Sequence, residues 1–88
     1  MSHLHQDKKI LNRLKRIQGQ FAAVEKSLTN PESSCIEVLQ QVAAVKGAVN
    51  GLMNQLIEQH LKEHVLKGAD HVDEEEVEKF FTLLQRYL

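Results

Sequence analysis

Apolar side chains recur along most of this chain at alternating steps of three and four residues, the spacing that places them on one face of a helix. No segment shows the strict alternation of apolar and polar residues that is typical of a strand. We therefore expect an all-α fold. The apolar stripes comprise Ile10, Leu14, Ile17, Phe21, Val24 and Leu28, then Val38, Val42, Val45, Val49, Leu52 and Leu56, and finally Val77, Phe80, Phe81, Leu84 and Leu88.

Capping and turn residues set the bounds of these helices. The segment TNPESS ends the first helix, and Ser34 is suited to cap the second. Gly68 offers a stop for the second helix, and Asp73, with Glu76 three residues later, resembles a capping box at the start of the third. We expect a single domain, 1–88, with helices over residues 7–28, 34–67 and 73–88.

The predicted middle helix is long for so small a chain. At 1.5 Å per residue it spans about 50 Å, and the shorter flanking helices leave much of it uncovered. Gly47 and Gly51 lie on its other side, where each costs about 1 kcal/mol relative to alanine, so we expect a close helix approach there. The alternative is that the helix merely tolerates these glycines. The length of the helix favours a dimeric or larger helical bundle.

Composition limits the classes of function. A chain of 88 residues with 42% apolar content can fold as one small domain, and it has no run of 18 apolar residues that could span a membrane. The amino terminus lacks the apolar core of a secretory signal, and one cysteine cannot form a disulfide framework, so we expect a cytoplasmic protein. No catalytic triad, phosphate-binding glycine loop or pair of acids in a cleft indicates an enzyme.

Charge is unevenly distributed although the formal net charge is -1. Residues 1–26 hold six basic and two acidic side chains, whereas residues 58–88 hold four basic and eight acidic ones. Several copies of the basic segment in an oligomer could neutralise DNA phosphates. A pI of about 6.5 is low for a nucleic-acid-binding domain, so this prediction depends on the clustering. The alternative is a helical interaction module whose basic side chains are merely solvated.

Cys35, His60 and His64 are candidate metal ligands. At about 100° per residue, the two histidines lie within about 20° of Cys35 around the helix axis. Along the axis, however, Cys35 is about 37 Å from His60, so one chain cannot bring them together. An antiparallel second copy that crosses near residue 48 or 49 would form two equivalent sites, suited to zinc, copper, nickel or cobalt. The alternative is a buried apolar cysteine with two solvated histidines.

The amino-terminal segment could add nitrogen ligands. His3 is a candidate, His5 is held in reserve, and removal of the initiator methionine would free the amine of Ser2. Five or six nitrogen and sulfur ligands would favour nickel or cobalt over tetrahedral zinc. His71 lies in the segment GADHVD and is expected to be a loop residue.

The segments RLKRIQGQ and LQQVAAVKGAVNGLM resemble the CsoR/RcnR family of bacterial metal- and stress-responsive repressors. The resemblance covers nearly the whole chain. It implies an antiparallel dimer that forms a four-helix bundle, a tetramer made as a dimer of dimers, and release of operator DNA when an effector binds. The DNA contacts expected on this basis are Lys8, Lys9, Arg13, Lys15, Arg16 and Lys46.

Within the resemblance, the residues at the ligand positions favour one effector class. The set His3, Cys35, His60 and His64 is similar to that of the nickel- and cobalt-responsive branch, in which the exposed amine also binds the metal and the repressed genes encode efflux. Copper sensors typically carry a second cysteine at the position of His64, and persulfide sensors use two cysteines. Formaldehyde sensors usually have proline where this chain has Ser2 and lack a histidine at position 64. A formaldehyde-responsive repressor that uses Cys35 as its nucleophile is the alternative.

Overall fold

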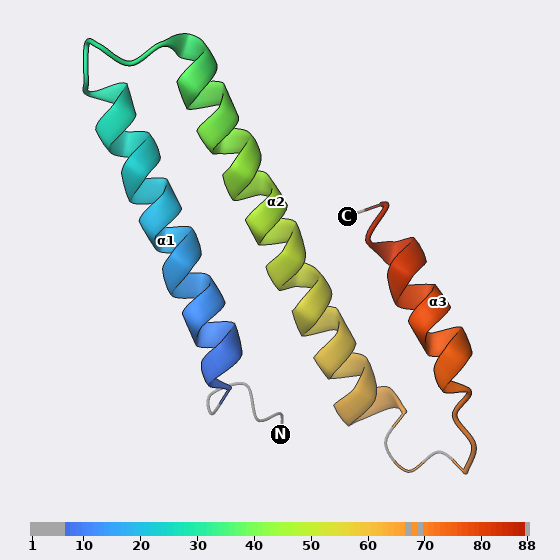
Figure 1. Cartoon of the computed structure of the whole chain (residues 1–88). Helices are drawn as coiled ribbons and strands as arrows, with labels where there is room; N and C mark the ends of the chain where they lie inside the picture. The colour runs from blue at the N-terminus through green and yellow to red at the C-terminus, as the bar shows by residue number, and fades with distance from the viewer. Residues whose placement is uncertain (1–6, 67, 69, 88) are drawn as a thin grey trace.

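The computed structural model describes residues 7–66, 68 and 70–87, with the backbone alone for His64 and Val65. α1 and α2 form an antiparallel hairpin, and α3 runs back beside the second half of α2 (Figure 1). Strands are absent from the described part of the chain, so the all-α prediction with three helices is confirmed. The elements are α1 (Lys8–Leu28), α2 (Cys35–His60), the π-helix η2 (Leu61–Val65) and α3 (Glu74–Leu84).

Side-chain caps start the first two helices where the sequence predicts. The Asp7 carboxylate accepts hydrogen bonds from the backbone N–H groups of Lys9 (2.9 Å) and Ile10 (3.1 Å). The Ser34 hydroxyl accepts one from the backbone N–H of Glu37 at 3.1 Å. These bonds satisfy donors that the first turn of a helix leaves without a partner, and they set the amino-terminal ends of both helices.

The second helical segment differs from the prediction at its carboxyl end. Its α-helical winding stops at His60 instead of continuing to residue 67. The backbone then widens into η2, in which the N–H of Leu66 donates to the carbonyl of Leu61, five residues back, at 2.8 Å. Gly68 follows with φ of +86°, a left-handed conformation that ends helical winding, as expected. Lys67 lies outside the described residues.

The third helix is shorter than predicted. It begins after its cap Asp73 but ends at Leu84 and does not reach residue 88. Beyond Leu84 the backbone forms a turn with a narrower hydrogen-bond spacing: the N–H of Arg86 donates to the carbonyl of Leu83, three residues back instead of four, at 3.1 Å. Leu88, the last member of the predicted apolar stripe, lies outside the described residues.

The core of the described chain is small. Only Ile17, Val45 and Phe81 are buried. The radius of gyration is 17.2 Å, against about 12 Å for a compact domain of this length. None of the described helices is long and apolar enough to cross a membrane. Large apolar side chains that remain exposed are Leu11, Leu14, Phe21, Leu28, Ile36, Leu39, Val42, Val49, Met53, Phe80, Leu83 and Tyr87.

The cap of α3 gives a direct test of this local structure. Asp73 accepts hydrogen bonds from the N–H groups of Glu75 (3.1 Å) and Glu76 (3.2 Å). We expect Asp73→Ala to destabilise α3 by about 1 kcal/mol because these donors lose their acceptor. Hydrogen exchange of the α3 amides would measure the effect. Asp70→Ala removes the same charge outside the helix and serves as the control; equal exchange rates in both variants would contradict the capping role.

Candidate functional site

The two predicted ligands with described side chains lie at opposite ends of α2. Cys35 is the first residue of the helix and carries an exposed free thiol, whereas His60 is its last residue and is also exposed. Because the helix is continuous between them, about 37 Å of helix axis separates the two residues. Within the described part of the chain, no group of three His, Cys, Asp or Glu side chains lies close enough to hold a metal ion. As the spacing predicts, one chain does not bring the thiol and the imidazole together.

The π-helix changes one part of the sequence prediction. His60 ends α2 and His64 lies within η2, so the backbone between them does not follow the α-helical rotation of about 100° per residue. The sequence prediction assumes α-helical winding as far as residue 67, so the π-helix is a departure from it. His71 is exposed in the connector before α3, as expected for a loop residue. The predicted amino-terminal ligands Ser2 and His3, and the reserve ligand His5, lie outside the described residues.

Lys62 brings positive charge to the end of the chain segment that carries the histidines. Its ammonium group lies 2.9 Å from a carboxylate oxygen of Glu58, one helical turn earlier. The hydrogen bond to Glu58 and the charge of that carboxylate raise the pKa of Lys62 above its ordinary value of 10.5, and Glu78 and Glu74 add to the increase. A Glu four residues before a Lys is a pattern that the sequence could have identified.

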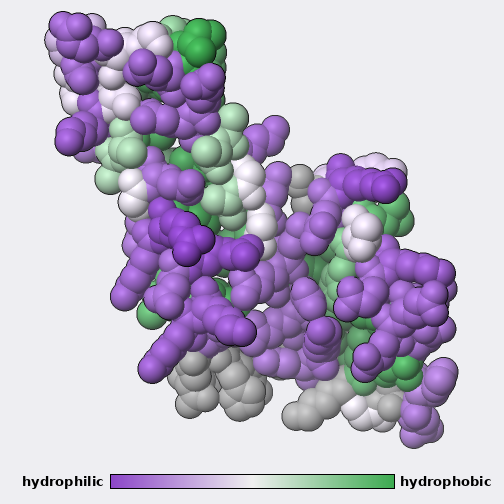
Figure 2. All heavy atoms as spheres, viewed as in Figure 1, coloured by the Kyte–Doolittle hydropathy of each residue, from purple (hydrophilic) through white to green (hydrophobic). Residues whose placement is uncertain are grey.

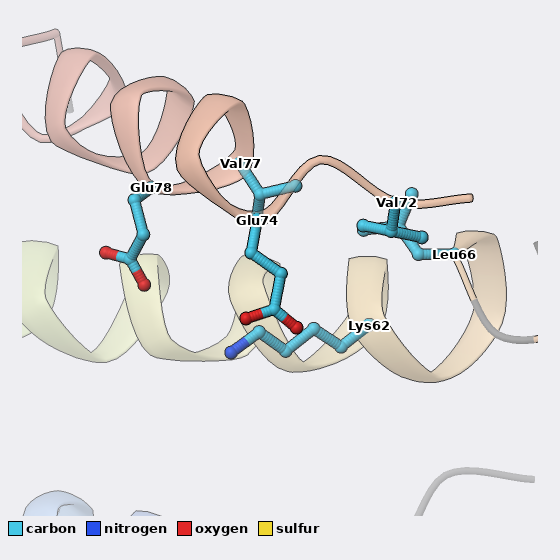
Figure 3. A pocket seen from close by; sticks show the side chains of 6 residues that line it. All are labelled: Lys62, Leu66, Val72, Glu74, Val77 and Glu78. Atoms are coloured by element: carbon cyan, nitrogen blue, oxygen red, sulfur yellow. The ribbon is translucent and has the colours of Figure 1, made fainter.

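The same lysine lines a cavity of about 310 Å³ between the end of α2 and α3. Figure 3 shows the side chain of Glu74 extending from α3 toward Lys62, with Glu78 on the same side and Leu66 and Val72 at one end. Acidic residues of α3 thus face a basic residue of η2. This attraction favours the position of α3 beside the histidine-bearing end of α2.

Five of the six predicted DNA-binding side chains form an exposed basic face on the amino-terminal half of α1, and the sixth, Lys46, is exposed on α2. Figure 2 shows strongly hydrophilic side chains gathered over this part of the hairpin. Among the described residues, none of the predicted contacts takes part in an ion pair with an acidic side chain. Their charge is therefore available to a polyanion. The exposed residues are Lys8, Lys9, Arg13, Lys15 and Arg16 on α1, and Lys46 on α2.

Two of these arginines border a groove between α1 and α2. The groove has a volume of about 230 Å³ and is lined by Arg13, Arg16, Ile17, Gly47, Ala48 and Gly51. A Cβ atom added to Gly51 would lie 2.8 Å from Nη1 of Arg13, whereas one added to Gly47 would meet nothing within 4 Å. The close helix approach expected at the two glycines is not observed among the described residues: at Gly51 only the end of the Arg13 side chain comes close, and at Gly47 nothing does. Sequence reasoning had no signal for this contact, because its two residues lie far apart in the chain.

An all-helical chain with a basic helix and exposed cysteine and histidine residues is consistent with a regulator that binds DNA and an effector. Residues 6–86 match the family described as metal-sensitive transcriptional repressor. The chain is 44% identical over 90 residues to the transcriptional repressor RcnR of Citrobacter koseri and 43% identical over 90 residues to RcnR of Escherichia coli. Each alignment covers 100% of this chain and 99% of the relative. An uncharacterized Serratia marcescens protein is 48% identical over 92 residues, with the same coverage.

A solved structure shows the same fold. A glutamate-to-histidine variant of the formaldehyde-responsive regulator FrmR from Salmonella enterica aligns with a TM-score of 0.66 and 43% sequence identity, covering 92% of each chain. The present chain belongs to the metal-sensitive transcriptional repressor family, CsoR/RcnR, and the resemblance inferred from its sequence is confirmed. The family is one of transcriptional repressors and not of enzymes, so DNA is a partner and metal sensing is the family's function.

The elevated pKa of Lys62 can be tested directly. Because the ion pair favours the charged form, the associated stability is present below pH 10.5 and is lost as pH rises through the elevated pKa. We expect Glu58→Gln to bring the pKa of Lys62 back toward 10.5 in an NMR titration of its side-chain signals. Glu78→Gln removes an equal charge that acts only through space, so it should lower the pKa less. If the pKa of Lys62 is the same in Glu58→Gln as in the wild type, Glu58 is not the main cause of its increase.

Proposed function

We propose that this chain is a cytoplasmic repressor that binds operator DNA in its metal-free form and releases it when nickel or cobalt binds, so that genes for metal efflux are expressed. One observation carries the proposal. Cys35 and His60 are both exposed, but they lie at opposite ends of a continuous helix. A site that uses both residues therefore needs a second copy of the chain.

Exposed apolar side chains on α2 support an antiparallel second copy. Val42, Val49 and Met53 are 49%, 40% and 48% exposed, although their spacing along α2 is that of a helix-packing stripe. A second α2 that crosses near residue 48 or 49 would cover these side chains and complete a four-helix bundle with both copies of α1. Exposed Phe80 and Leu83 on α3 would then be available for pairing two dimers into a tetramer.

The same crossing places the ligands of two copies together. Cys35 of one copy would lie beside His60 and His64 of the other, at each end of the dimer. A thiolate and two imidazoles suit nickel, cobalt and zinc, and the His3 imidazole and the Ser2 amine would raise the number of ligands above the four that zinc prefers. A bound ion would link the two copies of the chain through its coordination bonds to these sulfur and nitrogen ligands. The donor set of the chain therefore favours nickel or cobalt.

Recruitment of the amino terminus would couple effector binding to DNA release. Ser2 and His3 precede Asp7, which caps α1, and Lys8 and Lys9 occupy the first turn of that helix. Drawing Ser2 and His3 to the site would shift the start of α1 and with it the basic face. A coupling free energy of about 1–3 kcal/mol would change DNA affinity by about 5- to 150-fold.

Formaldehyde is the second candidate effector. The structurally similar FrmR variant is described as a formaldehyde-responsive regulator, and Cys35 offers an exposed thiol as a nucleophile. This function would share the fold, the assembly and the DNA face with the metal sensor. The two functions differ only in the effector, so titrating the DNA complex with metal ions and with formaldehyde distinguishes them.

The basic face of α1 can be tested by substitution. We expect Arg13→Ala and Arg16→Ala each to weaken DNA binding, and to reduce the slope of log affinity against log salt concentration by about 1 for each phosphate that is no longer neutralised. Fluorescence anisotropy at several salt concentrations would measure both quantities. Lys26→Ala removes an exposed charge at the other end of α1 and should change little. Unchanged binding in both arginine variants would instead favour a helical interaction module.

The effector site can be tested by titrating the protein and its DNA complex with nickel, cobalt, zinc and formaldehyde. We expect nickel and cobalt to release DNA, and cobalt to give a thiolate charge-transfer band that disappears in Cys35→Ala. His3→Ala should keep this band but change the ligand-field absorption, because the ion then has one nitrogen ligand fewer. Cobalt affinity should fall in acid as ligands are protonated. Release by formaldehyde alone would overturn the choice of effector.

A further inference from the structure

One contact between α1 and α2 connects a predicted DNA-binding side chain to a glycine. The guanidinium of Arg13 lies against the backbone of α2 at Gly51, where a Cβ atom would be 2.8 Å from Nη1 and 3.8 Å from Cζ. No other atom of Arg13 comes within 4 Å of that position. Nη1 is therefore the nitrogen of the guanidinium that lies closest to this position on α2.

Any side chain at residue 51 would meet the guanidinium in this position. A separation of 2.8 Å between a Cβ atom and a nitrogen is shorter than van der Waals contact, so even alanine would push the end of Arg13 aside. Arg13 is otherwise exposed, and within the described part of the chain it forms no ion pair that would fix its direction. The open space above Gly51 is thus the feature of α2 that admits Arg13 to its observed position.

The planar guanidinium suits this arrangement. Its five N–H donors are held in a fixed fork, so one edge can rest on the helix while the others remain free to bind an anion. Arg16 lies one turn later on α1 and lines the same groove. Both cations therefore face the space above the small residues Gly47, Ala48 and Gly51 of α2.

We propose that Gly51 is a positioning residue for DNA binding. Because it has no side chain, the guanidinium of Arg13 rests against α2 in the direction from which it contacts a backbone phosphate. This inference rests on the proposed function, since it assumes that Arg13 belongs to the DNA-binding face. Gly51 acts through Arg13 and does not itself touch the DNA.

The test compares Gly51→Ala with Gly47→Ala. Both substitutions replace a mid-helix glycine of α2 by a better helix former, so both should raise the midpoint of thermal unfolding. Only the first should displace Arg13, because a Cβ atom at residue 47 meets nothing within 4 Å. With a fluorescein-labelled DNA duplex of mixed sequence, we expect Gly51→Ala to lower the salt slope by about 1, which weakens binding about tenfold at 0.1 M salt. Gly47→Ala should bind as the wild type does.

A double substitution separates positioning from a general structural effect. If Gly51 acts through Arg13, then Gly51→Ala should cause no further decrease in affinity in a chain that already carries Arg13→Ala. Wild-type binding by Gly51→Ala, or an equal decrease with and without Arg13, would overturn the inference. If Arg13→Ala leaves affinity and salt slope unchanged, Arg13 is not part of the DNA-binding face and the inference fails; if Arg16→Ala is unchanged as well, the proposed DNA face itself is wrong. Weaker binding in Arg13→Ala but not in Gly51→Ala would reject the positioning role only.

Discussion

The rigidity of α2 is the constraint on which the rest of this structure depends. An α-helix rises 1.5 Å per residue, and backbone hydrogen bonds along its length keep it from folding back on itself. Cys35 and His60 are consequently held about 37 Å apart. The same length leaves apolar side chains such as Val42 and Met53 exposed in an isolated chain. In the proposed assembly, a second copy of the helix in the opposite direction joins the two chemical groups and also covers the apolar side chains.

Charge is arranged along this scaffold in two separate regions. The amino-terminal half of α1 carries basic side chains that no acidic residue of the described chain pairs with. Acidic residues of α3 instead face Lys62 in η2, just beyond the end of α2, where Glu58 also binds it. The basic face therefore remains open to an anion, whereas acidic side chains of α3 lie near Lys62 and Lys79 of the same chain. The near-neutral total charge conceals this division.

Sequence patterns predicted the parts of the fold that depend on local chemistry. Ser34 and Asp73 cap their helices because their side chains reach the N–H groups of the following turn, and a fixed helix rise was enough to separate Cys35 from His60. The π-helix at Leu61–Val65 was not predicted, because all five residues are also compatible with an α-helix. Nor was the contact of Arg13 with Gly51, which depends on how α1 packs on α2. The side chain of His64 and the amino-terminal ligands remain predictions.

The need for two antiparallel copies at one site is tested most directly by mixing two defective chains. Chains with Cys35→Ala and chains with His60→Ala each lack a ligand at every site of their own dimers. In a mixed antiparallel dimer, however, the intact Cys35 of one chain meets the intact His60 of the other. After subunit exchange, random pairing completes about one quarter of the sites, because about half of the dimers are mixed and one of their two sites is complete. We therefore expect the mixture to recover the wild-type cobalt absorption spectrum, which neither variant gives alone. No recovery of absorption after verified subunit exchange would contradict the account.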